Sequence, residues 1–227
     1  MLLLAIDTSG KNGSIALARA GEDSGDDDDV EVLETVPLTG GTFSAQLIPQ
    51  ISSLLAGQKV DKFALGAFAV ASGPGSFTGL RVGLAAVKAL AEVLRKPVVP
   101  VSLLELCIFV SGAKGRVVAA LDAGRNDIYV GDYDVAEQSG DPREYLLTAG
   151  EFFSHAKGST VITPDSAIAA SATSAGLNVT QVPPLSASSL ARLGWQKLRR
   201  GQTVSPDQLE ANYIRRTDAE MLEKIRS

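Results

Sequence analysis

The sequence predicts an α/β fold built as two lobes in tandem, each a mixed β-sheet flanked by helices. Three short strands followed by alternating helices and strands fill the first half of the chain, and the second half begins again with three strands. A meander of three strands followed by alternating helices and strands is typical of a mixed sheet with helices on its faces. Each half also opens on a strand that ends in an aspartate, Asp7 or Asp122. We expect lobes at residues 1–103 and 104–216, with the final helix returning toward the first lobe, and a tail at 217–227.

The first three strands surround a polar turn and an acidic segment. Residues 1–6 are apolar and end in Asp7-Thr8-Ser9-Gly10, which indicates a buried strand that delivers a carboxylate and two hydroxyls into a turn. Residues 14–20 and 30–36 predict a hairpin. Between them, residues 22–29 carry six carboxylates, without which the formal net charge would be +1 instead of −5. Such a run stays solvated, so we favour a loop over a cation site, for which we see no EF-hand spacing.

The rest of the first half alternates helices and strands. Ser44 is a candidate helix N-cap, and one apolar face follows it at helical spacing. Residues 63–71 are almost continuously apolar, which is typical of a central strand buried on both faces. A glycine-rich turn, Gly73-Pro74-Gly75-Ser76-Phe77-Thr78-Gly79, then opens a helix at 80–94. A strand at 98–101 and a helix at 103–110 complete this half.

The second half repeats the pattern without obvious sequence identity. Its predicted strands lie at residues 116–121, 128–135, 143–147, 161–163 and 179–182, and its helices at 150–156 and 166–175. Pro183-Pro184 interrupts the chain before a last amphipathic helix at 188–200.

Composition excludes several classes of protein. Apolar residues make up 45% and charged residues 21%, which is typical of a folded globular chain rather than a disordered one. One cysteine and one histidine exclude a disulfide framework and a zinc site made only of Cys and His. Asp7 interrupts the apolar start too early for a signal peptide or a spanning helix, so we expect a cytoplasmic protein without membrane contact.

The lone histidine and the lone cysteine have ordinary interpretations. His155 falls at a predicted helix end, where a surface histidine is favourable. As the base of a catalytic triad it would need a serine and an aspartate held against it, and no Gly-x-Ser-x-Gly elbow occurs. We expect Cys107 to be a small buried apolar residue. No catalytic residue and no metal site are predicted.

The glycine-rich turn allows two interpretations. Its backbone N–H groups beside a helix N-terminus would suit an anion. The segment, however, matches neither the P-loop nor the dinucleotide pattern and lacks the P-loop lysine. The alternative is a tight strand-to-helix turn that needs glycine for its backbone angles.

The helix at 80–94 carries two stripes. The apolar stripe consists of Leu80, Leu84, Val87, Ala91 and Leu94, and the small-residue stripe of Gly79, Gly83 and Ala86. Packing on the chain's own sheet needs one stripe. A helix that is apolar on more than one face suggests a second partner.

Four segments carry a family resemblance, and they occur in the order that the family has. They are Ala5-Ile6-Asp7-Thr8-Ser9, the glycine-rich motif from Gly73 to Gly83, Asp122 to Tyr129, and Asn212 to Arg215. With them, residues 2–216 resemble the TsaB (YeaZ) family of bacterial tRNA threonylcarbamoyladenosine biosynthesis proteins. The duplicated pattern resembles the actin, sugar-kinase and Hsp70 (ASKHA, ribonuclease H-like) superfamily. The chain departs from the family in having Phe43-Ser44 for His-Ser or His-Thr, Asp122-Ala123-Gly124 for Asp-Ala-Arg, and Ala211 for a proline.

The resemblance implies a non-catalytic scaffold subunit. The family pairs with TsaD, which transfers a threonylcarbamoyl group to N6 of adenosine 37 in tRNA (t6A37), and a third, ATP-hydrolysing subunit, TsaE, joins the complex. The partner surface that it implies consists of Gly75, Phe77, Thr78, Arg81, Leu84, Val87 and Lys88. The same stripe could form a homodimer when the partner is absent, and tRNA would be bound mainly through the complex. Arg199, Arg200, Arg215 and Arg216 could also reach phosphates.

The same resemblance bears on catalysis and cofactors. The catalytic sister family holds a metal with a His-x-x-x-His pair, and Leu103 and Cys107 occupy those positions here. One histidine cannot supply the pair, so we expect no catalysis and no required cofactor. In kinase and chaperone relatives an aspartate at the first strand tip serves nucleotide, which makes Asp7, Thr8 and Ser9 candidates for weak ATP or ADP binding. The alternatives are that Asp7 only caps its turn, and that the chain is an ATP-dependent small-molecule kinase or a peptidase of this fold.

Overall fold

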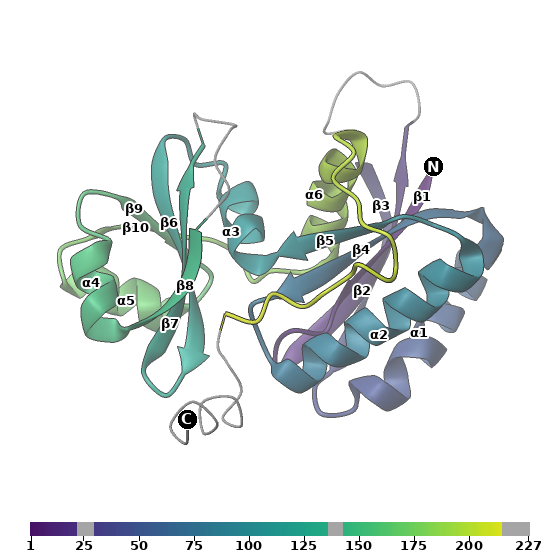
Figure 1. Ribbon diagram of the computed structural model, residues 1–227, viewed down its shortest axis with the longest axis horizontal. Helices are drawn as coiled ribbons and strands as arrows, with labels where there is room; N and C mark the ends of the chain where they lie inside the picture. The colour runs from purple at the N-terminus through teal and green to yellow at the C-terminus, as the bar shows by residue number, and fades with distance from the viewer. Residues whose placement is uncertain (22–29, 136–142, 215–227) are drawn as a thin grey trace. The chain divides into compact units, whose positions relative to one another are not determined.

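The structure, a computed structural model, describes residues 1–21, 30–135 and 143–214. The acidic segment 22–29, the tail 217–227, and Arg215 and Arg216 lie outside these residues. The described chain forms two compact units (Figure 1). Unit 1 comprises Met1–Leu106 and Leu185–Ala211, and unit 2 comprises Cys107–Pro184 with residues 212–214. The division falls inside the helix α3 (Leu103–Ser111).

Unit 1 is built on a mixed five-stranded sheet. Its strands are β1 (Leu2–Asp7), β2 (Asn12–Ala20), β3 (Val30–Thr39), β4 (Leu65–Gly73) and β5 (Val98–Ser102), in the order β3-β2-β1-β4-β5. β1 is antiparallel to β2 and parallel to β4. The apolar runs in β1 and β4 are buried on both faces, as a central strand requires.

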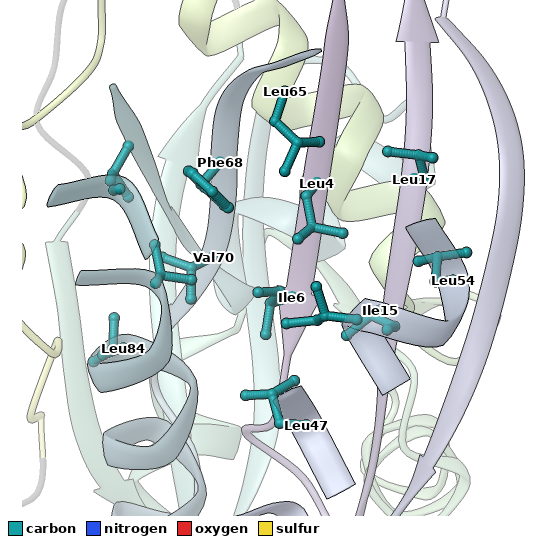
Figure 2. Packing of buried hydrophobic residues seen from close by; sticks show 14 of the residues in the cluster. Leu4, Ile6, Ile15, Leu17, Leu47, Leu54, Leu65, Phe68, Val70 and Leu84 are labelled. Carbon is teal, nitrogen blue, oxygen red and sulfur yellow. The ribbon is translucent and has the colours of Figure 1, made fainter. Parts of the chain in front are cut away.

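Helices cover both faces of this sheet. α1 (Phe43–Gly57) and α2 (Phe77–Leu94) lie on one face, and α6 (Ala187–Arg199) lies on the other (Figure 1). A short 3-10 turn, η1 (Lys62–Ala64), precedes β4. Alternate strand residues form the core with the first two helices, as Figure 2 shows for Leu4, Ile6, Ile15, Leu17, Phe68 and Val70 with Leu47, Leu54 and Leu84. The N-cap of α1 is Thr42, two residues before the predicted N-cap Ser44, and Phe43, the first residue of the helix, is buried in the core.

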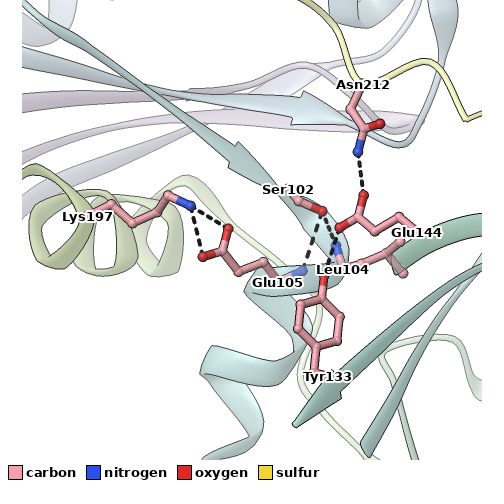
Figure 3. Close-up of polar contacts among 7 residues, drawn as sticks. All are labelled: Ser102, Leu104, Glu105, Tyr133, Glu144, Lys197 and Asn212. Atoms are coloured by element: carbon pink, nitrogen blue, oxygen red, sulfur yellow. Dashed lines mark hydrogen bonds and ion pairs between the residues drawn. The ribbon is translucent and has the colours of Figure 1, made fainter. Parts of the chain in front are cut away.

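α6 is held closely to unit 1. A Cβ on Gly194 would lie 2.6 Å from the Cβ of Ala69, so only glycine lets the helix approach β4 here. Lys197 Nζ lies 2.7 and 2.9 Å from the two carboxylate oxygens of Glu105 (Figure 3). Both side chains are largely buried, so this bidentate pair ties α6 to the first turn of α3.

Unit 2 repeats the topology of unit 1. Its strands are β6 (Arg116–Gly124), β7 (Asp127–Asp134), β8 (Arg143–Thr148), β9 (Thr160–Thr163) and β10 (Asn178–Gln181), in the order β10-β9-β6-β7-β8. In both sheets the first strand of the unit is central, with the next two strands on one side and the last two on the other. The predicted fold class, two lobes that are each a mixed β-sheet with flanking helices, is therefore confirmed.

Two helices pack on the second sheet. α4 (Ala149–His155) begins with a capping box, in which Thr148 and Glu151 exchange side-chain and backbone hydrogen bonds. α5 (Ser166–Ser174) follows β9, and Phe152 of α4 is fully buried among strand residues. Asn212 donates to one oxygen of the Glu144 carboxylate, and the hydroxyl of Tyr133 donates to the other at 2.7 Å (Figure 3). Among the helices of the described ranges, none is long and apolar enough to cross a membrane.

Candidate functional site

The turn after β1 is buried and internally hydrogen-bonded. Oδ1 of Asp7 accepts hydrogen bonds from the backbone N–H of Ser9 at 2.9 Å and from its hydroxyl at 2.5 Å. The hydroxyl of Thr8 donates to the carbonyl of Gly79 at 2.7 Å. All three side chains are buried, so the polar groups of this turn are used within the chain.

Burial also changes the acidity of this carboxyl group. Desolvation raises the pKa of Asp7 above its ordinary value, and the two hydrogen bonds from Ser9 oppose the rise. An ionised Asp7 is therefore costly to keep at this position. The two bonds from Ser9 offset part of that cost.

The glycine-rich turn fits against the Asp7 turn. A Cβ on Gly75 would lie 2.7 Å from the carbonyl oxygen of Ser9, and one on Gly79 only 2.0 Å from the carbonyl oxygen of Thr8. A Cβ on Gly83 would lie 2.4 Å from Oγ1 of Thr8. These distances are too short for any side chain, so the glycines are required because the two segments approach so closely.

The N-terminus of α2 is largely occupied by the same packing. The N–H of Ser76 donates to the carbonyl of Ser9 at 2.7 Å, and the Ser76 hydroxyl accepts from the N–H of Gly79 at 3.3 Å. The carbonyl of Ser76 accepts from Leu80. The structure thus favours the packing interpretation of this motif over the anion-site interpretation. Nucleotide binding by Asp7, Thr8 and Ser9 stays a prediction, and it would require their present hydrogen bonds to open.

The structure corrects two residues of the predicted partner surface. Leu84 and Val87 lie in the core of unit 1, together with Leu80, Ala91 and Leu94. The small-residue positions Gly79 and Gly83 face Thr8 rather than a second protein. The apolar stripe is therefore buried against the sheet, and the two glycines of the small-residue stripe are buried against the Asp7 turn, while Ala86 is half-buried.

A third face of α2 is exposed; the predicted partner surface includes its members Thr78, Arg81 and Lys88 but not its apolar row Ala85, Ala89 and Val93. Its members repeat at helical spacing and combine small or apolar residues with charged ones: Thr78, Arg81, Ala85, Ala89, Glu92 and Val93 are exposed, and Val82 and Lys88 are half-buried beside them. Val93 is 74% exposed. We call these eight residues the outer face of α2. A helical wheel places this face opposite the apolar stripe from Leu80 to Leu94, so the sequence alone could have identified it.

The other predicted surface residues lie at the start of α2. Gly75 and Phe77 are half-buried, while Thr78 and Arg81 are exposed. The guanidinium carbon of Arg81 lies 3.7 Å from the centre of the Phe77 ring, which is a close cation–π contact. This stack gives the outer face of α2 a rigid cationic end.

A second polar cluster lies in unit 2 around the only histidine. His155 ends α4, as predicted, and its Nε2 lies 2.8 Å from Oδ1 of Asp132 and 2.6 Å from the hydroxyl oxygen of Tyr145. The hydroxyl of Tyr145 also donates to Oδ2 of Asp132. Burial and the neighbouring Asp132 raise the pKa of Tyr145. No spacing in the sequence predicts this cluster, because its members come from three separate elements, β7, β8 and α4.

The remaining candidates are buried. Cys107 is completely buried, and desolvation raises the pKa of its thiol, so its prediction as a small core residue is confirmed. Leu103, aligned above with the other metal-ligand position, is also buried. Within residues 1–21, 30–135 and 143–214, no three side chains of His, Cys, Asp or Glu form a group that could hold a metal ion.

Comparison with known proteins gives one family model and several relatives. Residues 38–203 match the family model described as TsaD: tRNA N6-adenosine threonylcarbamoyltransferase. The tRNA threonylcarbamoyladenosine biosynthesis protein TsaB of Haemophilus influenzae is 34% identical over 132 residues, which are 57% of this chain and 52% of that protein. The Bacillus subtilis TsaB protein is 34% identical over 138 residues, 59% of this chain and 55% of that protein. The chain thus spans about half the length of the curated relatives that it matches.

Solved structures agree with this comparison. YeaZ from Pseudomonas aeruginosa superposes with a TM-score of 0.67 at 24% identity, covering 93% of this chain and 99% of that one. A second structure, described as similar to peptidase YeaZ from the same organism, has a TM-score of 0.65 at 26% identity and covers 94% of this chain and 99% of that one. The two-unit fold is shared over nearly the whole length of both.

Proposed function

Because this chain belongs to the tRNA N6-adenosine threonylcarbamoyltransferase family, and within it to the TsaB (YeaZ) proteins, we propose that it is a non-catalytic subunit for the threonylcarbamoyl modification of tRNA. In this proposal it forms a heterodimer with the catalytic subunit TsaD and acts together with the ATPase TsaE. It contributes a rigid surface that holds TsaD in its productive conformation, and tRNA is bound mainly through the complex.

The outer face of α2 is the observation that carries this proposal. Ala85, Ala89 and Val93 follow one another at intervals of four residues, so their side chains form one exposed apolar row. Small side chains let a second helix approach to the short end of the usual 8–10 Å range. Charges of both signs lie beside the row, Arg81 and Lys88 on the one hand and Glu92 on the other, so a partner would need charges of the opposite signs at its periphery.

The packing beneath this face supports a scaffold role. The core side of α2 carries Leu84 and Val87, and its first turn is fixed by the Gly79–Thr8 contact. A helix held this firmly loses little conformational entropy on association, because its backbone is already ordered. The outer face of α2 is therefore a preorganised surface.

Catalysis by this chain is not part of the proposal. One histidine cannot supply the paired imidazoles that the catalytic family uses, and the aligned residues Leu103 and Cys107 are buried. The alternative is an ATP-dependent kinase or a peptidase, and it would need Asp7 as a functional residue. The carboxylate of Asp7 already accepts two hydrogen bonds from Ser9. ATP turnover by the isolated chain that disappears in Asp7→Ala would support the alternative.

Association with TsaD tests the proposal. We expect Ala89→Glu to abolish co-purification with TsaD, because a carboxylate would be desolvated against an apolar surface. The matched control is Ala170→Glu, which places the same side chain on an exposed position of α5 in unit 2. If both variants co-purify as well as the unmodified chain, the interface does not include the outer face of α2. A homodimer of the isolated chain that Ala89→Glu dissociates would indicate self-pairing through this same face.

A further inference from the structure

A groove of unit 1 places two basic side chains beside hydroxyl-bearing residues. It lies between the C-terminus of α2 and the segment that follows α6, and it is lined by Arg95 and Lys96 of the former and by Thr203 and Ser205 of the latter. Val204 fixes this segment on the first residue of β5, because its N–H donates to that residue's carbonyl at 2.8 Å and its carbonyl accepts in return at 3.2 Å. The groove is therefore formed by backbone that is held in place.

The two basic side chains of the groove are available to a ligand. Arg95 is exposed and Lys96 is half-buried, and neither side chain has a hydrogen bond or an ion pair with any described residue. Glu92 is the other charged residue of the lining, so the formal charges of the groove add up to +1. The hydroxyl of Thr203 adds a donor, while that of Ser205 already donates to a neighbouring glutamine. A guanidinium, an ammonium and a hydroxyl group together suit a phosphate group.

An exposed aromatic ring lies at the same edge of the sheet. Phe63, in η1 just before β4, is 64% exposed, and Nζ of Lys62 lies 5.4 Å from the centre of its ring. Asp61 fixes this turn, since its carboxylate accepts from the N–H of Phe63 at 2.8 Å. Because β4 and β5 are parallel and both begin here, η1 and the groove share this edge. An exposed ring with cations nearby is the combination that stacks on the unpaired bases of RNA and holds its backbone.

We propose that this edge of unit 1 binds a single-stranded segment of RNA, with Arg95 and Lys96 contacting backbone phosphates and Phe63 stacking on a base. This goes beyond the proposed function, in which tRNA is bound mainly through the complex, and it rests on that function only for the identity of the RNA. An acidic protein segment could use the two cations, but it would not need the exposed ring.

Distance limits the opposition from the acidic segment 22–29. That segment follows β2, which ends at Ala20 at this same edge. In the order β3-β2-β1-β4-β5, however, β2 is three strands away from β5. At about 4.8 Å for each strand the separation is about 14 Å. The Debye length at physiological ionic strength is only about 8 Å, so charges near Ala20 are largely screened from the groove.

The salt dependence of RNA binding tests the proposal. Binding of an unmodified tRNA transcript to the isolated full chain is followed by fluorescence anisotropy between about 50 and 200 mM salt. We expect Arg95→Gln and Lys96→Gln each to reduce the slope of log affinity against log salt by about 0.7, the value for one phosphate contact of a single strand. Phe63→Ala should weaken binding at least about five-fold and leave the slope unchanged, because stacking involves no phosphate.

Lys157→Gln, at an exposed lysine of unit 2, is the matched control and should change neither the affinity nor the slope. RNA binding is measured on the chain by itself, so the result stands whether or not the chain pairs with TsaD. The proposal is overturned if the unmodified chain does not bind RNA at the lowest salt, if the slope is unchanged in Arg95→Gln and Lys96→Gln, or if Phe63→Ala binds as tightly as the unmodified chain. Loss of co-purification with TsaD in Lys96→Gln, with RNA binding intact, would assign the groove to a protein segment instead.

Discussion

Gly79 lies so close to Thr8 that a Cβ added to the glycine would be 2.0 Å from the carbonyl oxygen of the threonine. The hydroxyl of Thr8 in turn donates to the carbonyl of Gly79 at 2.7 Å. This contact joins residues that are 71 positions apart, and it sets how the first turn of α2 stands on the end of β1. The glycine-rich motif is therefore required first for packing. Its role in function follows from the position in which it holds α2.

The first prediction concerns this contact. Gly79→Ala should lower the free energy of unfolding by about 1–3 kcal/mol or more, because the added methyl group forces the backbones of two elements apart. Urea denaturation measures the effect. Gly150→Ala is the matched control, since a Cβ there meets no atom within 4 Å and the residue lies in the helix α4. Equal unfolding midpoints for the two variants would show that the close approach is not needed.

The second prediction separates the two sides of α2. Leu84→Ala removes a buried side chain from the core of unit 1 and should cost about 2–5 kcal/mol of stability. Ala85→Ser changes an exposed residue on the outer face and should alter stability by no more than about 0.5 kcal/mol. Thermal unfolding of the isolated chain distinguishes them. A small effect of Leu84→Ala would place that side chain outside the core.

The third prediction concerns Asp7 and pH. Since burial raises the pKa of this carboxyl in the folded chain, the protonated form is favoured by folding. In the unfolded chain the pKa of Asp7 is close to the ordinary value of 3.8, and in the folded chain it is higher. The favourable contribution of Asp7 to the free energy of unfolding is therefore fully present below the unfolded pKa. It is lost as the pH rises through the folded pKa. Asp7→Asn cannot ionise, and its side-chain oxygen can still accept from Ser9. The variant should therefore gain stability relative to the unmodified chain as the pH rises from 3 toward 7.

Urea denaturation at several pH values checks this prediction. Asp61→Asn, at an exposed residue, separates the effect of burial from that of the amide itself. If the difference in unfolding free energy between Asp7→Asn and the unmodified chain stays constant with pH, or changes in the opposite direction, burial does not control the acidity of Asp7.

The fourth prediction concerns the ion pair between α6 and α3. Lys197→Ala leaves the Glu105 carboxylate without its bidentate partner in a largely buried position, and should cost about 1–3 kcal/mol. Glu105→Gln should cost a similar amount. Because the two residues contact each other, the double variant should lose less than the sum of the single losses, with a coupling of about 0.5–3 kcal/mol. Additive losses would mean that the pair does not stabilise α6.

Much of the fold could be predicted from the sequence, because periodicity reports which residues are buried. The apolar run predicted at residues 63–71 became the interior strand β4 (Leu65–Gly73), and the repeated order of strands became two sheets of the same topology. Boundaries shifted only locally. α1, for example, starts at Phe43 because that ring packs into the core.

The site was harder to predict for a physical reason. A helical wheel shows that α2 has several apolar or small faces, but it does not show which face meets the sheet. Leu84 and Val87 were assigned to a partner although they fill the core, and Ala85, Ala89 and Val93 were overlooked. The partners of His155 come from the paired strands β7 and β8, and no spacing in the sequence marks them.

The central claim is that this chain serves a catalytic partner rather than catalysing the reaction itself. The most direct measurement is the formation of N6-threonylcarbamoyladenosine on tRNA by purified TsaD and TsaE of the source organism, with and without this chain. We predict that modified tRNA forms at a substantial rate only when the chain is added, that the chain alone forms none, and that Ala89→Glu fails to restore the reaction. Equal product with and without the chain would contradict the account.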